Sequence, residues 1–222
     1  MTTTKTRFTS TLGSMALALA AVSALGVGVT MALFSATQTS GSNSFASGTV
    51  SVGLGSASTT CTVSNMMPGD SSTNYGSGSA SLTPCDYRVK YTGTGAAWLA
   101  VDIAVNAGTP GLYTATSSGL QLKIGVNGGA SMMNGTVYKT QGGTDTTVAA
   151  GSPVTNLLVS SVPAATDDLV TFDVDYLLPL LAPNALQGGT ATVTLTFHAV
   201  QASNQPLGGC VAGRQCSDIT WG

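Results

Sequence analysis

The strongest restriction on the fold of this sequence comes from runs in which apolar and polar residues alternate. In Thr190–Ala202, apolar residues from Val193 to Ala199 occupy every second position, and threonines and His198 occupy the positions between them. A period of two is typical of a β-strand with one buried face. The same pattern recurs at Asp86–Tyr91, Trp98–Val105, Leu120–Val126 and Leu169–Tyr176, with shorter candidates at Thr49–Leu54 and Leu157–Ser160.

Turn-forming sequences such as Pro68-Gly69-Asp70 and Asn127-Gly128 separate these runs. No stretch after residue 36 has a convincing helical period. Several short strands, each with one apolar face, pack as two antiparallel sheets. We therefore predict an all-β fold, an antiparallel β-sandwich of the jelly-roll type, after an N-terminal signal helix.

Composition excludes several classes of function. Charged residues are only 7% of the 222, and the formal net charge is −2, so the chain lacks the basic surface of a nucleic-acid-binding protein. All nine acidic residues are Asp, and His198 is the only histidine. With a single histidine, the chain cannot form a metal or catalytic site that requires two or more histidines.

The N-terminus has the pattern of a secretory signal. Lys5 and Arg7 precede an uncharged, mostly apolar stretch, and Thr30-Met31-Ala32 matches a small-x-small cleavage site. A retained membrane anchor is the alternative, because the apolar stretch is about long enough to span a bilayer. We predict four segments: a signal peptide at 1–32, a lead-in segment at 33–47, a sandwich domain at 48–205 and a C-terminal tail at 206–222.

The four cysteines fit an exported protein. Four cysteines allow three pairings, and no CxxC spacing indicates a zinc or thioredoxin-like site. We favour Cys61–Cys85 and Cys210–Cys216, because each pair brackets a stretch rich in Gly, Ser or Pro. The second pair would staple the tail.

Several stretches of the chain, in order, resemble one family of exported proteins. They are Ala32-Leu33-Phe34-Ser35, Phe45-Ala46-Ser47-Gly48-Thr49-Val50, Met67-Pro68-Gly69-Asp70, Tyr91-Thr92-Gly93, Trp98-Leu99-Ala100-Val101, Leu178-Pro179, Ala182-Pro183-Asn184-Ala185-Leu186-Gln187-Gly188 and Phe197–Asn204. Together they are similar to the TasA and camelysin (CalY) family, which is exported through a SipW-type signal peptidase. Thr92 replaces the family's usual Asn, and the four cysteines are not a general family feature.

This resemblance implies a secreted jelly-roll protein in the extracellular matrix or at the cell surface, acting as a filament subunit of the biofilm matrix. Such subunits polymerise head to tail when each donates its N-terminal segment as a strand to the next. Here the donor would be Leu33–Phe45, with Leu33, Phe34 and Phe45 as assembly residues. An accessory anchoring protein is a further possible partner. An N-terminal segment that pairs with its own sheet, or stays unpaired, is the alternative.

Residues for catalysis are few, so we predict no enzymatic activity and no cofactor. His198 is interpreted as a surface histidine, since the chain has no Glu, no HExxH and no GxSxG. A camelysin-like metalloprotease that uses His198 remains one alternative function. A monomeric surface adhesin or ligand-binding module is another.

Four aspartates lie close together in the sequence and are weak calcium candidates: Asp167, Asp168, Asp173 and Asp175. Clustered carboxylate oxygens suit calcium, but the spacing is not that of an EF-hand. We favour the simpler interpretation that these side chains provide solubility and protect a sheet edge from unwanted pairing.

Overall fold

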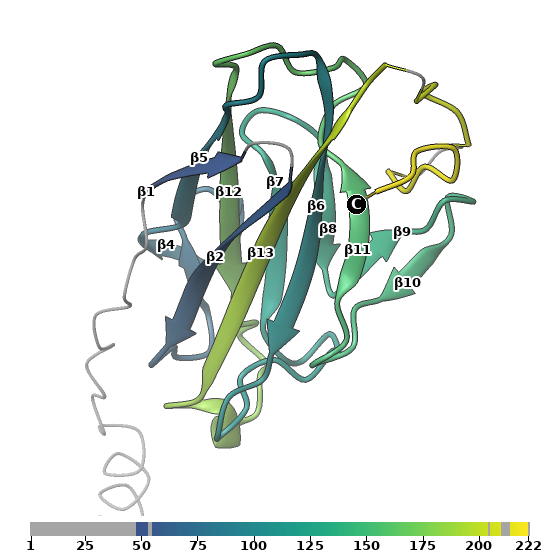
Figure 1. Cartoon of the computed structure of the whole chain (residues 1–222). Coiled ribbons are helices and arrows are strands. Elements are labelled where there is room, and N and C mark those ends of the chain that lie inside the picture. The colour runs from purple at the N-terminus through teal and green to yellow at the C-terminus, as the bar shows by residue number, and fades with distance from the viewer. Residues whose placement is uncertain (1–47, 53–54, 204, 210–213, 222) are drawn as a thin grey trace, which may run out of the picture. The chain divides into compact units, whose positions relative to one another are not determined.

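Two facing β-sheets make up the described part of the chain in the computed structural model (Figure 1). The structure describes residues 48–52, 55–203, 205–209 and 214–221. Their one helical element is the short 3-10 helix η1 (Asn184–Leu186), and the described residues contain no helix with the length and apolarity needed to cross a membrane. The predicted signal segment, residues 1–32, lies outside these residues.

The smaller sheet, called sheet B, has the strand order β11-β6-β13-β2. Its strands are β2 (Gly55–Ser64), β6 (Ala97–Asn106), β11 (Val154–Leu158) and β13 (Thr190–Gln201). The larger sheet, called sheet A, has the order β1-β5-β12-β7-β8-β9-β10, with β3 and β4 attached beside β12. Its strands are β1 (Gly48–Val52), β3 (Asp70–Ser72), β4 (Ser79–Leu82), β5 (Cys85–Tyr91), β7 (Gln121–Val126), β8 (Ser131–Gly135), β9 (Val137–Lys139), β10 (Asp145–Thr147) and β12 (Leu169–Leu177).

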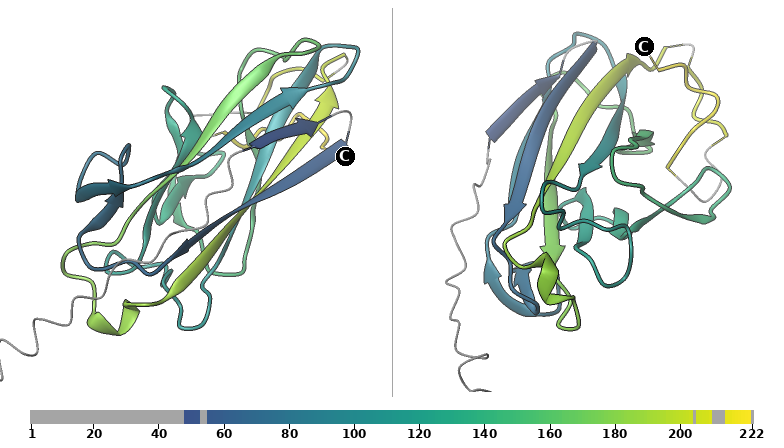
Figure 2. Two further views of the ribbon diagram at one scale, coloured as in Figure 1. Left: turned by 90° about the vertical axis from the view of Figure 1, so that its left-hand side faces the viewer. Right: turned by 90° about the horizontal axis from the view of Figure 1, so that it is seen from below.

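Eight of these strands are arranged in the two sheets in the order that defines a jelly roll. In chain order they are β2, β5, β6, β7, β8, β11, β12 and β13. Sheet B joins the first, eighth, third and sixth of them, and sheet A joins the second, seventh, fourth and fifth, all by antiparallel pairing. This is the double Greek-key order of a jelly roll. The predicted fold class is confirmed, and Figure 2 shows the two layers from two further sides.

The alternation in the sequence corresponds to the face that each sheet turns to the core. Along β13, the inward-facing side chains of Val193, Leu195 and Phe197 are at most 1% exposed. The Phe197 ring meets the Phe172 ring of β12 edge to face, with centroids 5.2 Å apart, so the contact joins the two sheets. One continuous apolar core therefore fills the space between them.

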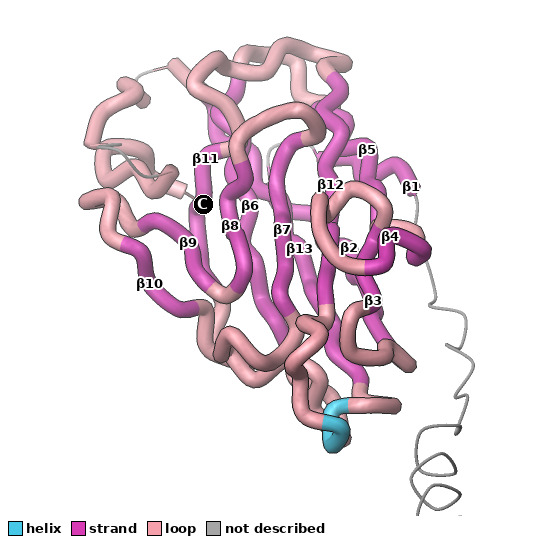
Figure 3. Tube along the Cα trace, turned by 180° about the vertical axis from the view of Figure 1, so that it is seen from behind, coloured by secondary structure: helices cyan, strands magenta, loops and turns pink. Residues whose placement is uncertain are grey.

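From Phe172 to Tyr176, strand β12 is buried on both faces, whereas Asp173 and Asp175 were interpreted from the sequence as solubilising residues. Their exposed fractions are 9% and 4%. The cover is the segment 70–82, which forms β3 and β4 beside β12 (Figure 3). The interpretation was wrong because alternation shows which residues share a face, and not whether another segment covers that face.

A buried serine links this cover to β12. The Ser72 hydroxyl donates a hydrogen bond to Asp175 Oδ1 at 2.8 Å and accepts one from the Tyr176 amide at 3.0 Å. We expect Ser72→Ala to lower the free energy of unfolding by about 1–3 kcal/mol, because it leaves a buried carboxylate oxygen and a buried amide without this partner. Urea denaturation measures the change.

Ser71→Ala is the matched control. Ser71 is as fully buried as Ser72, but its hydroxyl has no hydrogen-bond partner among the described residues. Its removal is therefore expected to be neutral or slightly stabilising. Equal losses for the two variants would contradict the role given to the Ser72 hydrogen bonds.

The C-terminal tail packs on the outer face of sheet B. Trp98, Leu158, Cys216 and Ile219 form a second apolar cluster there, and the Trp98 indole N–H donates to the Gln205 carbonyl at 2.8 Å. The Arg214 guanidinium donates to the carbonyls of Leu158 and Val159. The tail is thus part of the folded domain along β11.

Candidate functional site

The predicted donor residues Leu33, Phe34 and Phe45 lie outside the described residues. The described chain begins with β1, which pairs in parallel with β5 from Gly48 opposite Tyr87 to Val52 opposite Tyr91. β1 is therefore an edge strand of sheet A, and β2 follows it at the edge of sheet B. Figure 1 shows these two edges on the same side of the sandwich.

Strand β2 presents a long unprotected edge. It has ten residues, Gly55–Ser64, and among the described strands it pairs with β13 alone. The strand contains no charged residue and no proline, and its outward-facing side chains are serines and threonines such as Ser56 and Thr60. Edge strands normally carry lysine, proline or a bulge that prevents pairing with another chain. The edge of β2 lacks all of these along its regular register with β13.

The opposite edges of the two sheets are protected, in contrast to β2. At the far edge of sheet B, β11 contains a register shift, and the tail covers it: the Leu158 amide donates to the Arg214 carbonyl at 2.7 Å. At the far edge of sheet A, β10 has three residues, and Asp145 forms an ion pair with Lys139 at 2.8 Å. Only short, charged or covered backbone is presented at these two described edges.

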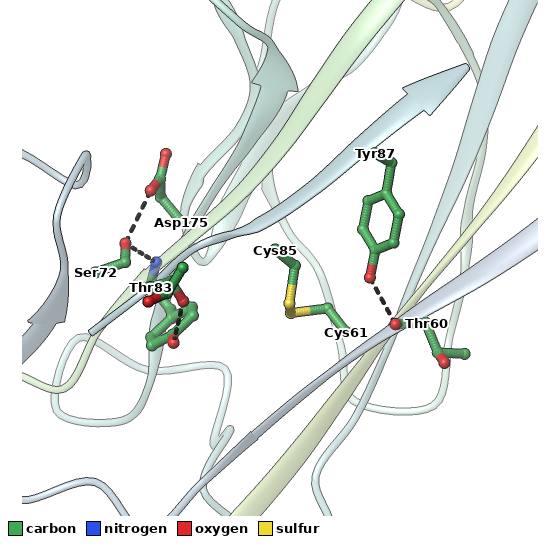
Figure 4. Close-up of a disulfide and its surroundings, with 8 residues drawn as sticks. Thr60, Cys61, Ser72, Thr83, Cys85, Tyr87 and Asp175 are labelled. Carbon is green, nitrogen blue, oxygen red and sulfur yellow. Dashed lines mark hydrogen bonds between the residues drawn. A yellow bond between two sulfur atoms is a disulfide. The ribbon is translucent and has the colours of Figure 1, made fainter. Parts of the chain in front are cut away.

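Two links hold β2 against sheet A (Figure 4). The disulfide Cys61–Cys85 joins β2 to β5, which confirms the predicted pairing, and both residues are at most 1% exposed. Beside the disulfide, the Tyr87 hydroxyl of β5 donates to the carbonyl of Thr60, the residue before Cys61, at 2.5 Å. The edge strand is therefore fixed in position by contacts between sheets as well as by its pairing with β13.

The second predicted disulfide involves a residue that is not described. Cys216 is disulfide-bonded, and its side chain lies in the cluster beneath the tail. Cys210, the partner predicted for it, lies outside the described residues.

The four aspartates named as weak calcium candidates are not brought together. Asp167 forms an ion pair with Lys90 at 2.7 Å, and Asp168 Oδ2 accepts a hydrogen bond from the Ala165 amide at 2.7 Å, both in the loop before β12. Asp173 and Asp175 lie farther along the strand beneath the β3–β4 cover. Among the described residues, no group of three or more acidic, histidine or cysteine side chains is arranged to hold a metal ion.

His198 is part of a structural pair. Its Nε2 lies 2.9 Å from Asp102 Oδ2, and the Asp102 Oδ1 accepts a hydrogen bond from the Asn156 amide at 2.7 Å. The His198 side chain is 17% exposed, so it is more enclosed than the predicted surface histidine. On the neighbouring strand, the Ser58 hydroxyl bonds to Thr196 at 2.9 Å, which links β2 to β13. These contacts connect β13 to β6, β11 and β2.

The comparisons with known proteins name no family. No family model matches the sequence, and no curated protein matches it. Among solved structures, the chain is similar to PliG of Aeromonas hydrophila, a periplasmic inhibitor of g-type lysozyme, with a TM-score of 0.25 and 7% identity over 70% of this chain and 100% of that chain. A similarity this low does not bear on function, and the resemblance to TasA and camelysin stays a prediction.

Proposed function

We propose that this chain is a secreted structural subunit of a surface or biofilm-matrix filament that assembles head to tail by strand donation. The observation that carries the proposal is the edge of β2, which is ten residues long, uncharged and paired on one side only among the described strands. An extended segment of a second copy would pair with this edge and add a strand to sheet B. Because donor and acceptor are different surfaces, the contact propagates into an open filament.

The predicted donor has the length that this edge requires. At about 3.3 Å per residue, Leu33–Phe45 spans roughly 43 Å when extended, and the ten residues of β2 span roughly 33 Å. In an extended segment Leu33 and Phe45 lie on one face and Phe34 lies on the other. Leu33, Phe34 and Phe45 are the apolar residues with which this segment would anchor itself on the next copy.

Two further features support the proposal. The buried Cys61–Cys85 disulfide fits an exported protein, because disulfides persist in oxidising compartments. The few charges of the chain reduce repulsion between copies packed closely in a polymer. The proposal gives no residue a catalytic role and includes no cofactor. Export through a SipW-type signal peptidase and anchoring by an accessory protein follow from the resemblance alone.

Negative-stain electron microscopy tests the donor. We expect filaments from the chain 33–222 and monomers from a chain that begins at Ala46, because the second lacks the donated strand. Monodisperse particles from both chains, across concentration and pH, would contradict the filament. Binding assays for a monomeric adhesin would then be the next step.

Lysine substitutions on β2 test the acceptor. We expect Ser56→Lys combined with Thr60→Lys to abolish filaments of the chain 33–222, because charges on an edge strand oppose pairing. Thr146→Lys on the short edge strand β10 is the control, and it should leave filaments intact. Circular dichroism and size-exclusion chromatography confirm that each variant folds. Filaments from the β2 variant would overturn the assignment of β2 as acceptor.

A further inference from the structure

A polar hollow of about 400 Å³ lies on the outer face of sheet A, above Gly125 of β7. Asp173 and Asp175 of β12 form one side, Ser131 of β8 forms another, and Asn74 reaches it from the loop between β3 and β4. Most of the residues that line it are polar or glycine. It is separate from the β2 edge, because β2 belongs to sheet B and the strands that line the hollow, β7, β8 and β12, belong to sheet A.

Glycine at position 125 keeps the hollow open. Gly125 lies directly opposite Asp173 in the register of β7 and β12, so no side chain fills the space beside that carboxylate. The register between β7 and β8 also shifts at Gly125. A Cβ atom there would lie 3.1 Å from the Ser131 Cα, so the shifted backbone favours glycine at this position.

Asp175 has partners within the fold. Its Oδ1 accepts the hydrogen bond from Ser72, and Lys123 of β7 lies directly opposite it. Burial raises the pKa of Asp175, and the hydrogen bond from Ser72 and the charge of Lys123 offset part of that rise because both favour the ionised form. The positive charge of Lys123 thus compensates Asp175.

Asp173 is without such a partner. Its side chain is nine-tenths buried, and its Oδ1 has no hydrogen-bond partner among the described residues. Of the side chains around it on this face, Asp86 of β5 lies directly opposite and carries the same charge. Burial, with smaller contributions from Asp86 and Asp175, raises the pKa of Asp173 to about 6. Its other neighbours are Arg88, which is exposed and diagonal on β5, and Lys123, which lies opposite Asp175.

We propose that this hollow binds a small organic cation, a primary amine on a molecule that also carries hydroxyl groups, with Asp173 as its counter-ion. An ammonium group supplies the positive charge and the hydrogen-bond donors that Asp173 lacks. Asn74, Asn127 and Ser131 line the same hollow and offer partners to hydroxyl groups. A divalent metal fits less well, because it needs several ligating side chains and the described residues include no cluster of three, whereas an ammonium group needs one carboxylate as its counter-ion.

Serinol and glycerol form a matched pair of probes, since they differ by an ammonium group in place of a hydroxyl. In amide NMR spectra of the ¹⁵N-labelled chain 33–222 near pH 7.5, we expect serinol to shift the signals of Gly125, Gly129 and Ser131 saturably. Glycerol should bind at least roughly tenfold more weakly, because it cannot pair with a carboxylate. Acidification to about pH 5 should weaken serinol binding, because Asp173 becomes protonated.

Asp173→Asn preserves the shape of the side chain and removes its charge, so it should weaken serinol binding at least roughly tenfold. Asp86→Asn is the control, because Asp86 lies on the same face but does not line the hollow. It removes a neighbouring negative charge and leaves the counter-ion Asp173 in place, so it should weaken serinol binding less than Asp173→Asn does. Equal binding of serinol and glycerol, or no saturable shift with either, would overturn the proposal. Unchanged affinity in Asp173→Asn, or shifts with calcium chloride alone, would also overturn it.

Discussion

Replacing both Cys61 and Cys85 with alanine is expected to lower the free energy of unfolding by about 3 kcal/mol. The two cysteines are 24 residues apart, and closing a loop of that size removes roughly this much conformational freedom from the unfolded chain. Both residues are buried in the core, so the loss of the two sulfur atoms adds a packing cost. For a domain of this size the melting temperature should fall by about 10 °C in calorimetry.

The wild-type chain in its reduced form is the control for this measurement. It keeps both sulfur atoms and lacks only the bond, so it separates the effect of the link from the effect of packing. We expect most of the loss to appear on reduction alone. A melting temperature that does not change on reduction, with loss of the disulfide confirmed by thiol titration, would show that the link adds no stability.

Alternation in the sequence predicted the strands with strong contrast between their two faces. Thr190–Ala202 corresponds to β13 and Leu169–Tyr176 to β12, within one or two residues at each end. Strand β2 was missed, although it is one of the longest strands. In its first half the inward positions are the small Ala57 and the polar Thr59, so inward and outward residues differ little in hydropathy there, and only Cys61 and Val63 are fully buried. Contact with β13 and with the opposite sheet decides its conformation.

The candidate sites could not be predicted in full from the sequence, because they depend on contacts between residues that are far apart along the chain. The pairing Cys61–Cys85 was predicted correctly, but from the loop between the two residues, whereas in the structure it joins opposite sheets. The contact of Asp102 with His198 depends on the register of β6 and β13. The residues that surround Asp173 and Asp175 come from β3, β5 and β7, which are distant in the sequence. The period of two predicts which residues share one face of a strand. Which strands then lie next to each other, and so which faces meet, is determined by the topology of the two sheets.

Asp173→Asn is expected to stabilise the protein at neutral pH and to leave its stability almost unchanged near pH 4. A pKa of about 6 in the folded state, against an ordinary value of 3.8, means that the folded protein holds a proton that the unfolded chain releases. Stability contributed by this group is therefore present at low pH and is lost as the pH rises from about 4 to about 6. The shift corresponds to roughly 3 kcal/mol.

Urea denaturation at several pH values between about 4 and 8, in amine-free buffers, measures this difference between variant and wild type. The gain in the free energy of unfolding should grow from near zero at about pH 4 to roughly 2–3 kcal/mol above pH 6. Asp145→Asn is the control, because Asp145 is exposed in a surface ion pair, so its difference from wild type should be small throughout. A gain for Asp173→Asn that is the same at every pH would mean that burial of the Asp173 charge is not its cause. Saturating serinol should raise the stability of the wild type at neutral pH and not that of Asp173→Asn, because only the ionised carboxylate would gain a partner.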